Sequence, residues 1–152
     1  MIKRILILCI GNICRSPMAE GLMKRALPDY EVTSAGLGAL VGQPADSHAI
    51  ALMLEQGIDI TAHRARQLES WMAAAADLVL VMDTEQKDHL VMQYPLYRGK
   101  TFRLGEVGQY DIADPYRQGL DTFRAAAGLV EQGVDAWAER IKAITDKKVA
   151  AQ

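Results

Sequence analysis

One short run near the start of the chain constrains the fold more than any other feature of the sequence. Residues 5–10 are all Ile, Leu or Cys, a composition typical of a β-strand buried on both faces in a parallel sheet. Gly11 and Asn12 end the run. We expect a helix to follow, with Ser16 as its N-cap and Pro17 as its first residue. The pattern therefore predicts a strand, a short loop and a helix in close succession.

Strands and helices alternate along the rest of the chain. We expect further strands at residues 30–35, 76–82 and 100–104, and helices at 17–27, 47–56 and 84–93. A last helix is predicted by apolar residues that recur every three or four positions, namely Phe123, Ala127, Val130, Val134, Trp137, Ile141 and Ile144. Strands that alternate with helices predict an α/β fold with a parallel sheet.

Size and composition limit the classes of protein that the chain can represent. Its 152 residues match one average domain, spanning residues 1–152. The sequence has 17 basic and 19 acidic residues, so its net charge gives no reason to expect a nucleic-acid partner. No apolar run approaches the roughly 20 residues of a membrane span, and two cysteines are too few for a disulfide scaffold. We expect a cytoplasmic domain with no nucleic-acid partner and no membrane insertion.

The loop after the first strand combines residues that suit phosphate chemistry. It begins at Cys9, ends at Arg15, and holds between them Ile10, Gly11, Asn12, Ile13 and Cys14. Backbone N–H groups in such a loop can form an anion-binding nest at the helix N-terminus. Arg15 can add a bidentate contact to two phosphate oxygens. Since the same positive field stabilises a thiolate at Cys9, the pattern predicts nucleophilic attack on the phosphorus of a bound monoester.

Other ligand motifs fit this loop less well. It lacks the G-x-G-x-x-G of dinucleotide-binding loops and the Gly-Lys-Ser/Thr of Walker A loops. A zinc site built on both cysteines would need two more ligands, and His48, His63 and His89 lack the spacing of paired zinc ligands. Without the rest of the motif, Cys9 would be interpreted as a small residue of the hydrophobic core, and Arg15 as a solvent-exposed charge at a helix start. We expect no metal and no cofactor.

A thiol that attacks phosphorus needs a general acid to protonate the leaving oxygen. Asp114 is the candidate, because Pro115 favours an extended conformation at the residue before it and stiffens the presentation of the carboxyl group. An Asp-Pro pair is more often only a turn. Asp111, three residues earlier, is the alternative acid.

Together these motifs resemble those of the low-molecular-weight protein tyrosine phosphatases. Cys-x₅-Arg-Ser-Pro stands at residues 9–17 and Asp-Pro-Tyr at 114–116, and the segments 33–36 and 62–67 also match. The resemblance covers nearly the whole chain. It implies a four-stranded parallel sheet flanked by helices on both faces, with the phosphate-binding loop after the first strand.

The resemblance also implies residue roles. Cys9 attacks to form a cysteinyl-phosphate, Asp114 protonates the leaving phenol and later activates water, and Arg15 binds the phosphoryl oxygens. Supporting residues are Asn12, which holds a left-handed kink in the loop, Ser16, which donates to the thiolate, and Ser34. His63 either joins this network or is a surface histidine at a helix start. Cys14 either traps oxidised Cys9 as a disulfide or only fills space.

The residues that we expect to surround the bound phosphate indicate the class of substrate. Related protein-arginine phosphatases typically carry threonine where this chain has Ile13, and an isoleucine cannot hydrogen-bond a guanidinium. Phosphotyrosine is therefore favoured over phosphoarginine. Tyr116 resembles the family's aromatic residue at the entrance, and we expect Leu40 to take the place of a second aromatic residue in the loop 36–44.

The small-residue loop and the pair Tyr116 and Arg117 are similar to those of bacterial phosphatases paired with exopolysaccharide or capsule tyrosine kinases. We expect an autophosphorylating bacterial tyrosine kinase as the partner. Two alternatives stay open. A module that only binds phosphotyrosine would have lost Cys9 or Asp114, and both are present. A thiol-coupled arsenate reductase relies on further distal cysteines, and the sequence has none after Cys14.

Overall fold

The computed structural model describes the backbone of residues 1–150 and the side chains of residues 1–147. Its centre is a sheet of four strands, in the order β2-β1-β3-β4. All three strand pairs are parallel. The strands are β1 (Arg4–Cys9), β2 (Glu31–Gly36), β3 (Leu78–Val81) and β4 (Thr101–Arg103). The predicted α/β class and four-stranded parallel sheet are confirmed, with strand ends that differ from expectation by one or two residues.

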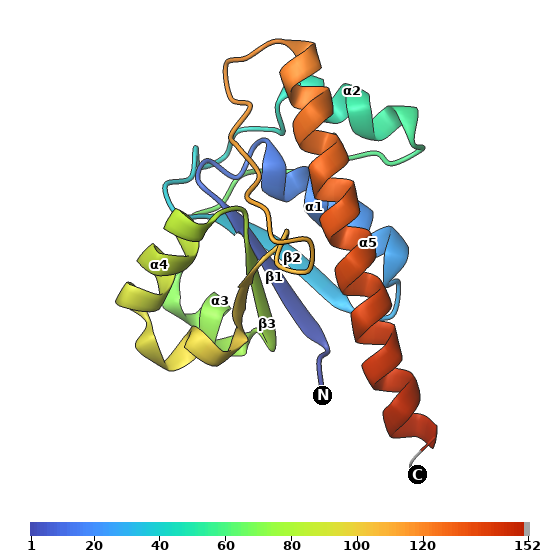
Figure 1. Cartoon of the computed structure of the whole chain (residues 1–152). Helices are drawn as coiled ribbons and strands as arrows, with labels where there is room; N and C mark the ends of the chain where they lie inside the picture. The colour runs from blue at the N-terminus through green and yellow to red at the C-terminus, as the bar shows by residue number, and fades with distance from the viewer. Residues whose placement is uncertain (151–152) are drawn as a thin grey trace.

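Helices cover both faces of the sheet, as predicted (Figure 1). One face carries α1 (Arg15–Ala26), α2 (Ser47–Glu55) and α5 (Leu120–Ala150). The other carries α3 (Ser70–Ala75), α4 (Thr84–Gln93) and the short 3-10 helix η1 (Pro95–Lys100). Neither α3 nor η1 was predicted, because each is only six residues long and too short to establish a helical period.

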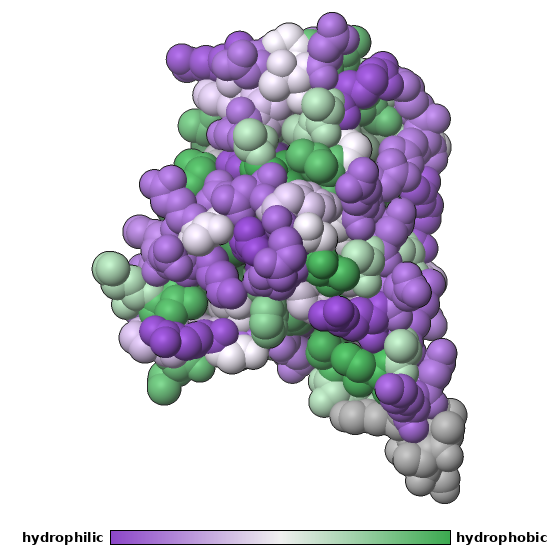
Figure 2. All heavy atoms as spheres, viewed as in Figure 1, coloured by the Kyte–Doolittle hydropathy of each residue, from purple (hydrophilic) through white to green (hydrophobic). Residues whose placement is uncertain are grey.

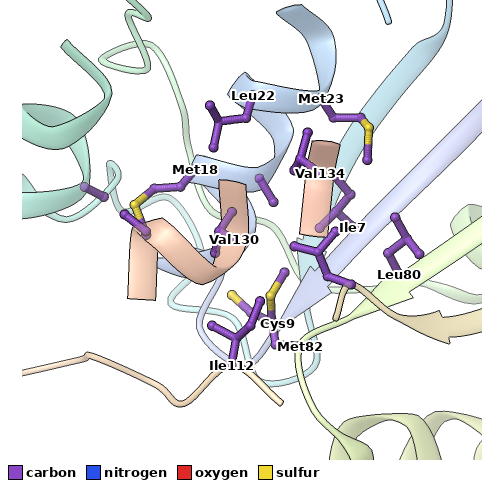
Figure 3. Close-up of a cluster of buried hydrophobic side chains, with 14 of the residues drawn as sticks. Ile7, Cys9, Met18, Leu22, Met23, Leu80, Met82, Ile112, Val130 and Val134 are labelled. Carbon is purple, nitrogen blue, oxygen red and sulfur yellow. The ribbon is translucent and has the colours of Figure 1, made fainter. Parts of the chain in front are cut away.

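The apolar run of β1 is buried on both sides of the sheet. Ile5, Ile7 and Cys9 belong to the core under α1 and α5, whereas Leu6 and Leu8 belong to the core under α3 and α4. This alternation follows from the period of two in a strand. Figure 3 shows Ile7 and Cys9 within the larger core, so the hydrophobic packing of β1 ends directly at a thiol.

The start of α1 differs from the prediction. The helix begins at Arg15, with Cys14 in the N-cap position, and Ser16 is fully buried inside its first turn. Ser16 as N-cap was therefore wrong. Pro17 is compatible with this earlier start, because the first four N–H groups of a helix have no intrahelical acceptor to lose.

Helix α5 follows the predicted apolar stripe, except at its end. Six of the seven predicted positions are buried, but Ile144 is 47% exposed, because the last turns of α5 extend past the body of the sheet (Figure 1). The outward side of α5 is mostly hydrophilic (Figure 2). Within residues 1–150, no helix combines the length and apolar character that a bilayer crossing requires.

Candidate active site

Cys9 lies where the order of the strands places a crevice. It is the last residue of β1. From β1 the chain passes to β2 on one side, and from β2 it crosses to β3 on the other side of β1. Loops at such a switch point diverge and leave room for a ligand. The loops after β1 and β2 also meet closely: a Cβ atom at Gly36 would collide with the carbonyl oxygen of Ile10. Only glycine fits at that position.

The loop after β1 is kinked at Asn12, which has a φ of 58°. Its side chain reaches three surrounding elements. Nδ2 donates to Ser16 Oγ at 2.7 Å and to Ser34 Oγ at 3.0 Å, and Oδ1 accepts from the backbone N–H of Arg66 at 3.0 Å. The backbone carbonyl of Asn12 lies 2.7 Å from His63 Nε2. The expected kink at Asn12 is present, and these four contacts hold it.

Replacement of Asn12 tests how much this kink matters. Asn12→Ala removes three side-chain hydrogen bonds, each worth about 1 kcal/mol, and places a Cβ-bearing residue without them at positive φ, which adds roughly 1 kcal/mol. We expect a loss of about 3–4 kcal/mol in the free energy of unfolding, measured by urea denaturation. Asn12→Gly is the matched control, since glycine adopts this φ freely. Equal stability of the two variants would contradict a strained kink.

The two cysteines of the loop occupy different environments. Cys9 Sγ lies 2.9 Å from the Ser16 hydroxyl, which can donate to a thiolate. Burial raises the pKa of the Cys14 thiol well above its usual range, and the nearby carboxylates Asp46 and Asp114 raise it further. Cys14 is therefore a protonated thiol at neutral pH, and the hydroxyl contact belongs to Cys9.

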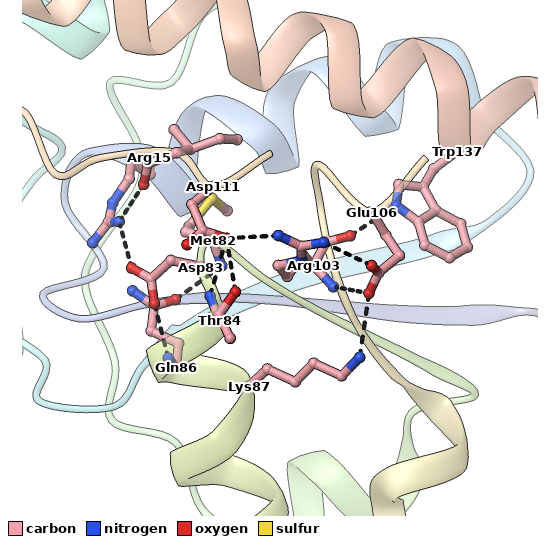
Figure 4. A network of polar contacts seen from close by, with 11 residues as sticks. Arg15, Met82, Asp83, Thr84, Gln86, Lys87, Arg103, Glu106, Asp111 and Trp137 are labelled. Atoms are coloured by element: carbon pink, nitrogen blue, oxygen red, sulfur yellow. Dashed lines mark hydrogen bonds and ion pairs between the residues drawn. The ribbon is translucent and has the colours of Figure 1, made fainter. Parts of the chain in front are cut away.

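Arg15 is a buried cation whose contacts leave part of its guanidinium free. Its side chain is 2% exposed. Nη1 donates to the carbonyl of Ile112 at 2.7 Å and to Asp83 at 3.4 Å (Figure 4), while Nη2 lies 3.6 Å from Asp114 Oδ2. Among the described residues, Nε has no hydrogen-bond acceptor. A buried donor without an acceptor is rare, and an oxyanion above the loop would supply one.

A cavity of about 130 Å³ opens over this loop. Nine of the residues expected at the site line it, together with Gly38; the nine are Cys9, Ile10, Gly11, Ile13, Cys14, Arg15, Leu40, Asp114 and Tyr116. Asn12, which we also expected to contact substrate, is fully buried and is not part of this lining. The cavity thus combines a thiol, a guanidinium and a carboxyl group with apolar walls.

The structure separates the two candidate acids. Asp114 lies at the cavity, and its Oδ1 accepts from the backbone N–H of Tyr116 at 3.0 Å. Asp111 instead pairs with Arg103 at 2.9 Å and accepts from Thr84 (Figure 4). The hydrogen bond from Arg103 lowers the pKa of Asp111, which keeps it ionised. Asp111 is therefore a structural carboxylate outside the lining of the cavity.

Comparison with known proteins identifies the family to which the chain belongs. The model of the low molecular weight phosphotyrosine protein phosphatases matches residues 4–148. The chain belongs to this family. The probable low molecular weight protein-tyrosine-phosphatase EpsP of Ralstonia nicotianae is 53% identical to it over 144 residues, which cover 95% of this chain and 99% of the relative.

Solved structures give the same fold for this phosphatase. Wzb of Vibrio vulnificus in complex with benzylphosphonate has a TM-score of 0.88 and 39% identity, covering 92% of this chain and 99% of that one. The YwlE arginine phosphatase of Geobacillus stearothermophilus has a TM-score of 0.90 and 38% identity, covering 95% and 96%. Because the backbone is shared with a phosphatase named for arginine, the side chains of the cavity must decide the substrate.

Three residues support the site of the phosphatase without having been predicted to do so. Arg66 donates through Nε to the carbonyl of Ser34 at 2.8 Å. Gln67 joins the backbone of Leu37 and Ala39 through both ends of its amide, which fixes the loop that carries Leu40. Asp83, the N-cap residue just before the predicted helix 84–93, also contacts Arg15. The motif at residues 62–67 marked Arg66 and Gln67, but their partners are distant in sequence.

Proposed function

We propose that this chain hydrolyses phosphotyrosine in proteins through a cysteinyl-phosphate intermediate. The observation that carries the proposal is the placement of Cys9 and Arg15 at one cavity, where Arg15 Nε finds no acceptor in the described part of the chain. A phosphoryl group held by the loop amides and by Arg15 would sit next to the sulfur. Such a cradle stabilises the charge that develops on the oxygens of phosphorus in the transition state.

In the first step, the thiolate of Cys9 attacks phosphorus and forms a sulfur–phosphorus bond. The bond between phosphorus and the phenolic oxygen breaks, and Asp114 gives its proton to that oxygen. Ser16, at 2.9 Å from Cys9 Sγ, stabilises the thiolate before the attack. Tyrosine then leaves as the neutral phenol.

In the second step, the now ionised Asp114 accepts a proton from water as the water oxygen attacks phosphorus. The sulfur–phosphorus bond breaks, which releases inorganic phosphate and restores the thiolate of Cys9. Asp114 is 44% exposed, so water can reach it from the mouth of the cavity. The cycle returns Asp114 to its protonated form and consumes one water molecule.

Three apolar or aromatic side chains favour phosphotyrosine over phosphoarginine. Ile13, Leu40 and Tyr116 line the cavity, and Tyr116 can stack against a phenyl ring. Ile13 offers no acceptor for the N–H groups of a guanidinium, which would lose its hydrogen bonds to water on entry. The benzyl ligand of the Vibrio vulnificus structure is an aryl group of the kind that these walls suit.

The physiological substrate that we propose is an autophosphorylating bacterial tyrosine kinase that controls exopolysaccharide or capsule production, and we propose that this chain acts on it in the cytoplasm. The similarity to EpsP supports this assignment. Incubation with the phosphorylated kinase from the same genome tests it. Loss of the phosphotyrosine signal is the expected result, and an unchanged signal with an enzyme active on aryl phosphates would exclude this partner.

The activity itself is tested with two matched phosphopeptides, one with phosphotyrosine and one with phosphoarginine at the same position. In the presence of EDTA, we expect release of phosphate from the phosphotyrosine peptide and little from the other. Tight binding of the phosphotyrosine peptide without turnover would instead indicate a binding module. Preferential turnover of phosphoarginine would contradict the proposal that Ile13, Leu40 and Tyr116 favour phosphotyrosine.

A further inference from the structure

A second hollow, of about 500 Å³, adjoins the cavity over the phosphate-binding loop. The two share Ile10, Arg15, Gly38 and Asp114 in their linings, so they are continuous. The second hollow extends toward the start of α4, whose Asp83, Glu85, Gln86 and His89 lie along it. If the first cavity holds the phosphotyrosine ring, as proposed above, the peptide chain on one side of that tyrosine would pass over the second hollow.

The second hollow carries an excess of negative charge. Besides the general acid Asp114, Asp83 and Glu85 contribute two carboxylates, whereas Arg15 contributes one cation. Arg15 contacts both aspartates, and it also serves the phosphate. Glu85 is exposed in the first turn of α4 and has no salt bridge among the described residues. An uncompensated carboxylate beside an anion-binding site attracts a cation.

Gln86 provides an independent indication of a ligand in this hollow. Its side chain is 3% exposed. The backbone N–H of Met82 donates to Oε1 at 2.9 Å, which fixes the orientation of the amide. Nε2 is then a buried donor with no acceptor among the described residues. Figure 4 places Gln86 beside Asp83, at the same edge of the site as Arg15.

We propose that this hollow binds a lysine or arginine side chain that flanks the phosphotyrosine of the substrate. Its cation pairs with Glu85, and a carbonyl oxygen of the peptide accepts from Gln86 Nε2. The inference rests on the proposed function, since it needs a phosphotyrosine peptide in the first cavity. The hollow therefore selects among phosphotyrosine sites by the charge of the neighbouring residue.

Peptides that differ at one position test this selection. Phosphotyrosine peptides carry Lys, Ala or Glu next to the phosphotyrosine, on either side of it in separate series, and kcat/KM is measured for each. In one series we expect the Lys peptide to exceed the Glu peptide by about fivefold at low ionic strength, the upper end of the range for exposed charge pairs. In 0.5 M salt the ratio should fall to about two, because salt screens such pairs.

Glu85→Gln is the variant that tests the assignment of the cation site. We expect it to lower the ratio of Lys to Glu peptide about threefold. Asp29→Asn is the matched control, because Asp29 is also exposed but lies just before β2, at the opposite ends of the strands. Asp29→Asn should give the same ratio of kcat/KM for the Lys and Glu peptides as the unchanged chain.

The outcomes separate this inference from the proposed function. Equal rates for all peptides, or a ratio insensitive to Glu85→Gln, would overturn the cation site while the phosphatase activity stands. No hydrolysis of any phosphotyrosine peptide would overturn the proposed function instead. A crystal structure with a phosphonate analogue of the Lys peptide should place the ammonium at Glu85, and an ammonium on the Arg117 side of the mouth would also contradict the inference.

Discussion

Replacing Cys9 with serine is expected to reduce kcat by at least about 10⁴-fold while leaving the affinity for inorganic phosphate nearly unchanged. Serine is a far weaker nucleophile than a thiolate at neutral pH. The anion cradle itself consists of loop amides and Arg15, and neither is altered. Turnover of an aryl phosphate measures the loss, and isothermal titration with phosphate measures the retained binding.

Cys14→Ser is the matched control for this experiment. Burial and the carboxylates of Asp46 and Asp114 keep the Cys14 thiol protonated. Replacing Cys14 therefore does not remove the nucleophile. We expect a far smaller reduction in kcat than for Cys9→Ser. If the two variants lost the same activity, or if Cys9→Ser retained turnover, the sulfur at the end of β1 would not be the nucleophile.

Replacing Asp114 with asparagine is expected to slow poor leaving groups by roughly 10²–10⁴-fold, the usual contribution of a general acid. A phenol with a low pKa departs as the anion and needs less help, so activated aryl phosphates should lose less. The measurement is kcat for a series of substituted phenyl phosphates. A steeper dependence on the pKa of the leaving phenol is expected in the variant than in the unchanged chain.

Asp111→Asn is the control for Asp114→Asn. It removes a carboxylate three residues away that is held by Arg103 and Thr84 and does not line the cavity. We expect only a small change in kcat, with no change in the dependence on the leaving group. Equal losses for activated and unactivated phenols in Asp114→Asn, together with a leaving-group effect in Asp111→Asn, would assign the acid to Asp111.

The parts of the fold that the sequence predicts well are those determined by local pattern. The run at residues 5–10 requires burial on both sides, and β1 is buried by α1 on one face and α3 on the other. Asp83 caps the start of α4 and Gly57, at positive φ, follows the end of α2, and the predicted helices 84–93 and 47–56 begin and end next to these two residues. Each of these signals is contained in a few neighbouring residues.

The predictions that failed concern choices between local and distant partners. Ser16 is a residue type that favours the N-cap position, but its hydroxyl contacts Cys9 and Asn12 instead, and the helix begins two residues earlier than predicted. Helix α3 has too few residues for a period, and packing against the sheet stabilises it. Tertiary contacts outweighed local propensity in both cases.

The candidate site was predictable where one motif contains it and not where segments far apart meet. Cys9 to Arg15 form a single loop, so their proximity follows from the sequence. The contacts of Asn12 with Ser34 and Arg66, and of Arg15 with Asp83, join residues separated by 22 to 68 positions. Without the fold, no spacing rule connects them. That Gln86 Nε2 lacks an acceptor among residues 1–147 is visible only once its surroundings are known.

The bracing of Asn12 by its neighbours has a consequence for the energetics of catalysis. Since β2, α1 and the segment around His63 hold the kink through protein contacts alone, the curve of the main chain is established before any ligand arrives. Binding energy from the phosphate is then not spent on ordering the loop, and remains available to lower the barrier. Ligand-free and oxyanion-loaded crystals should accordingly superpose along residues 9–15.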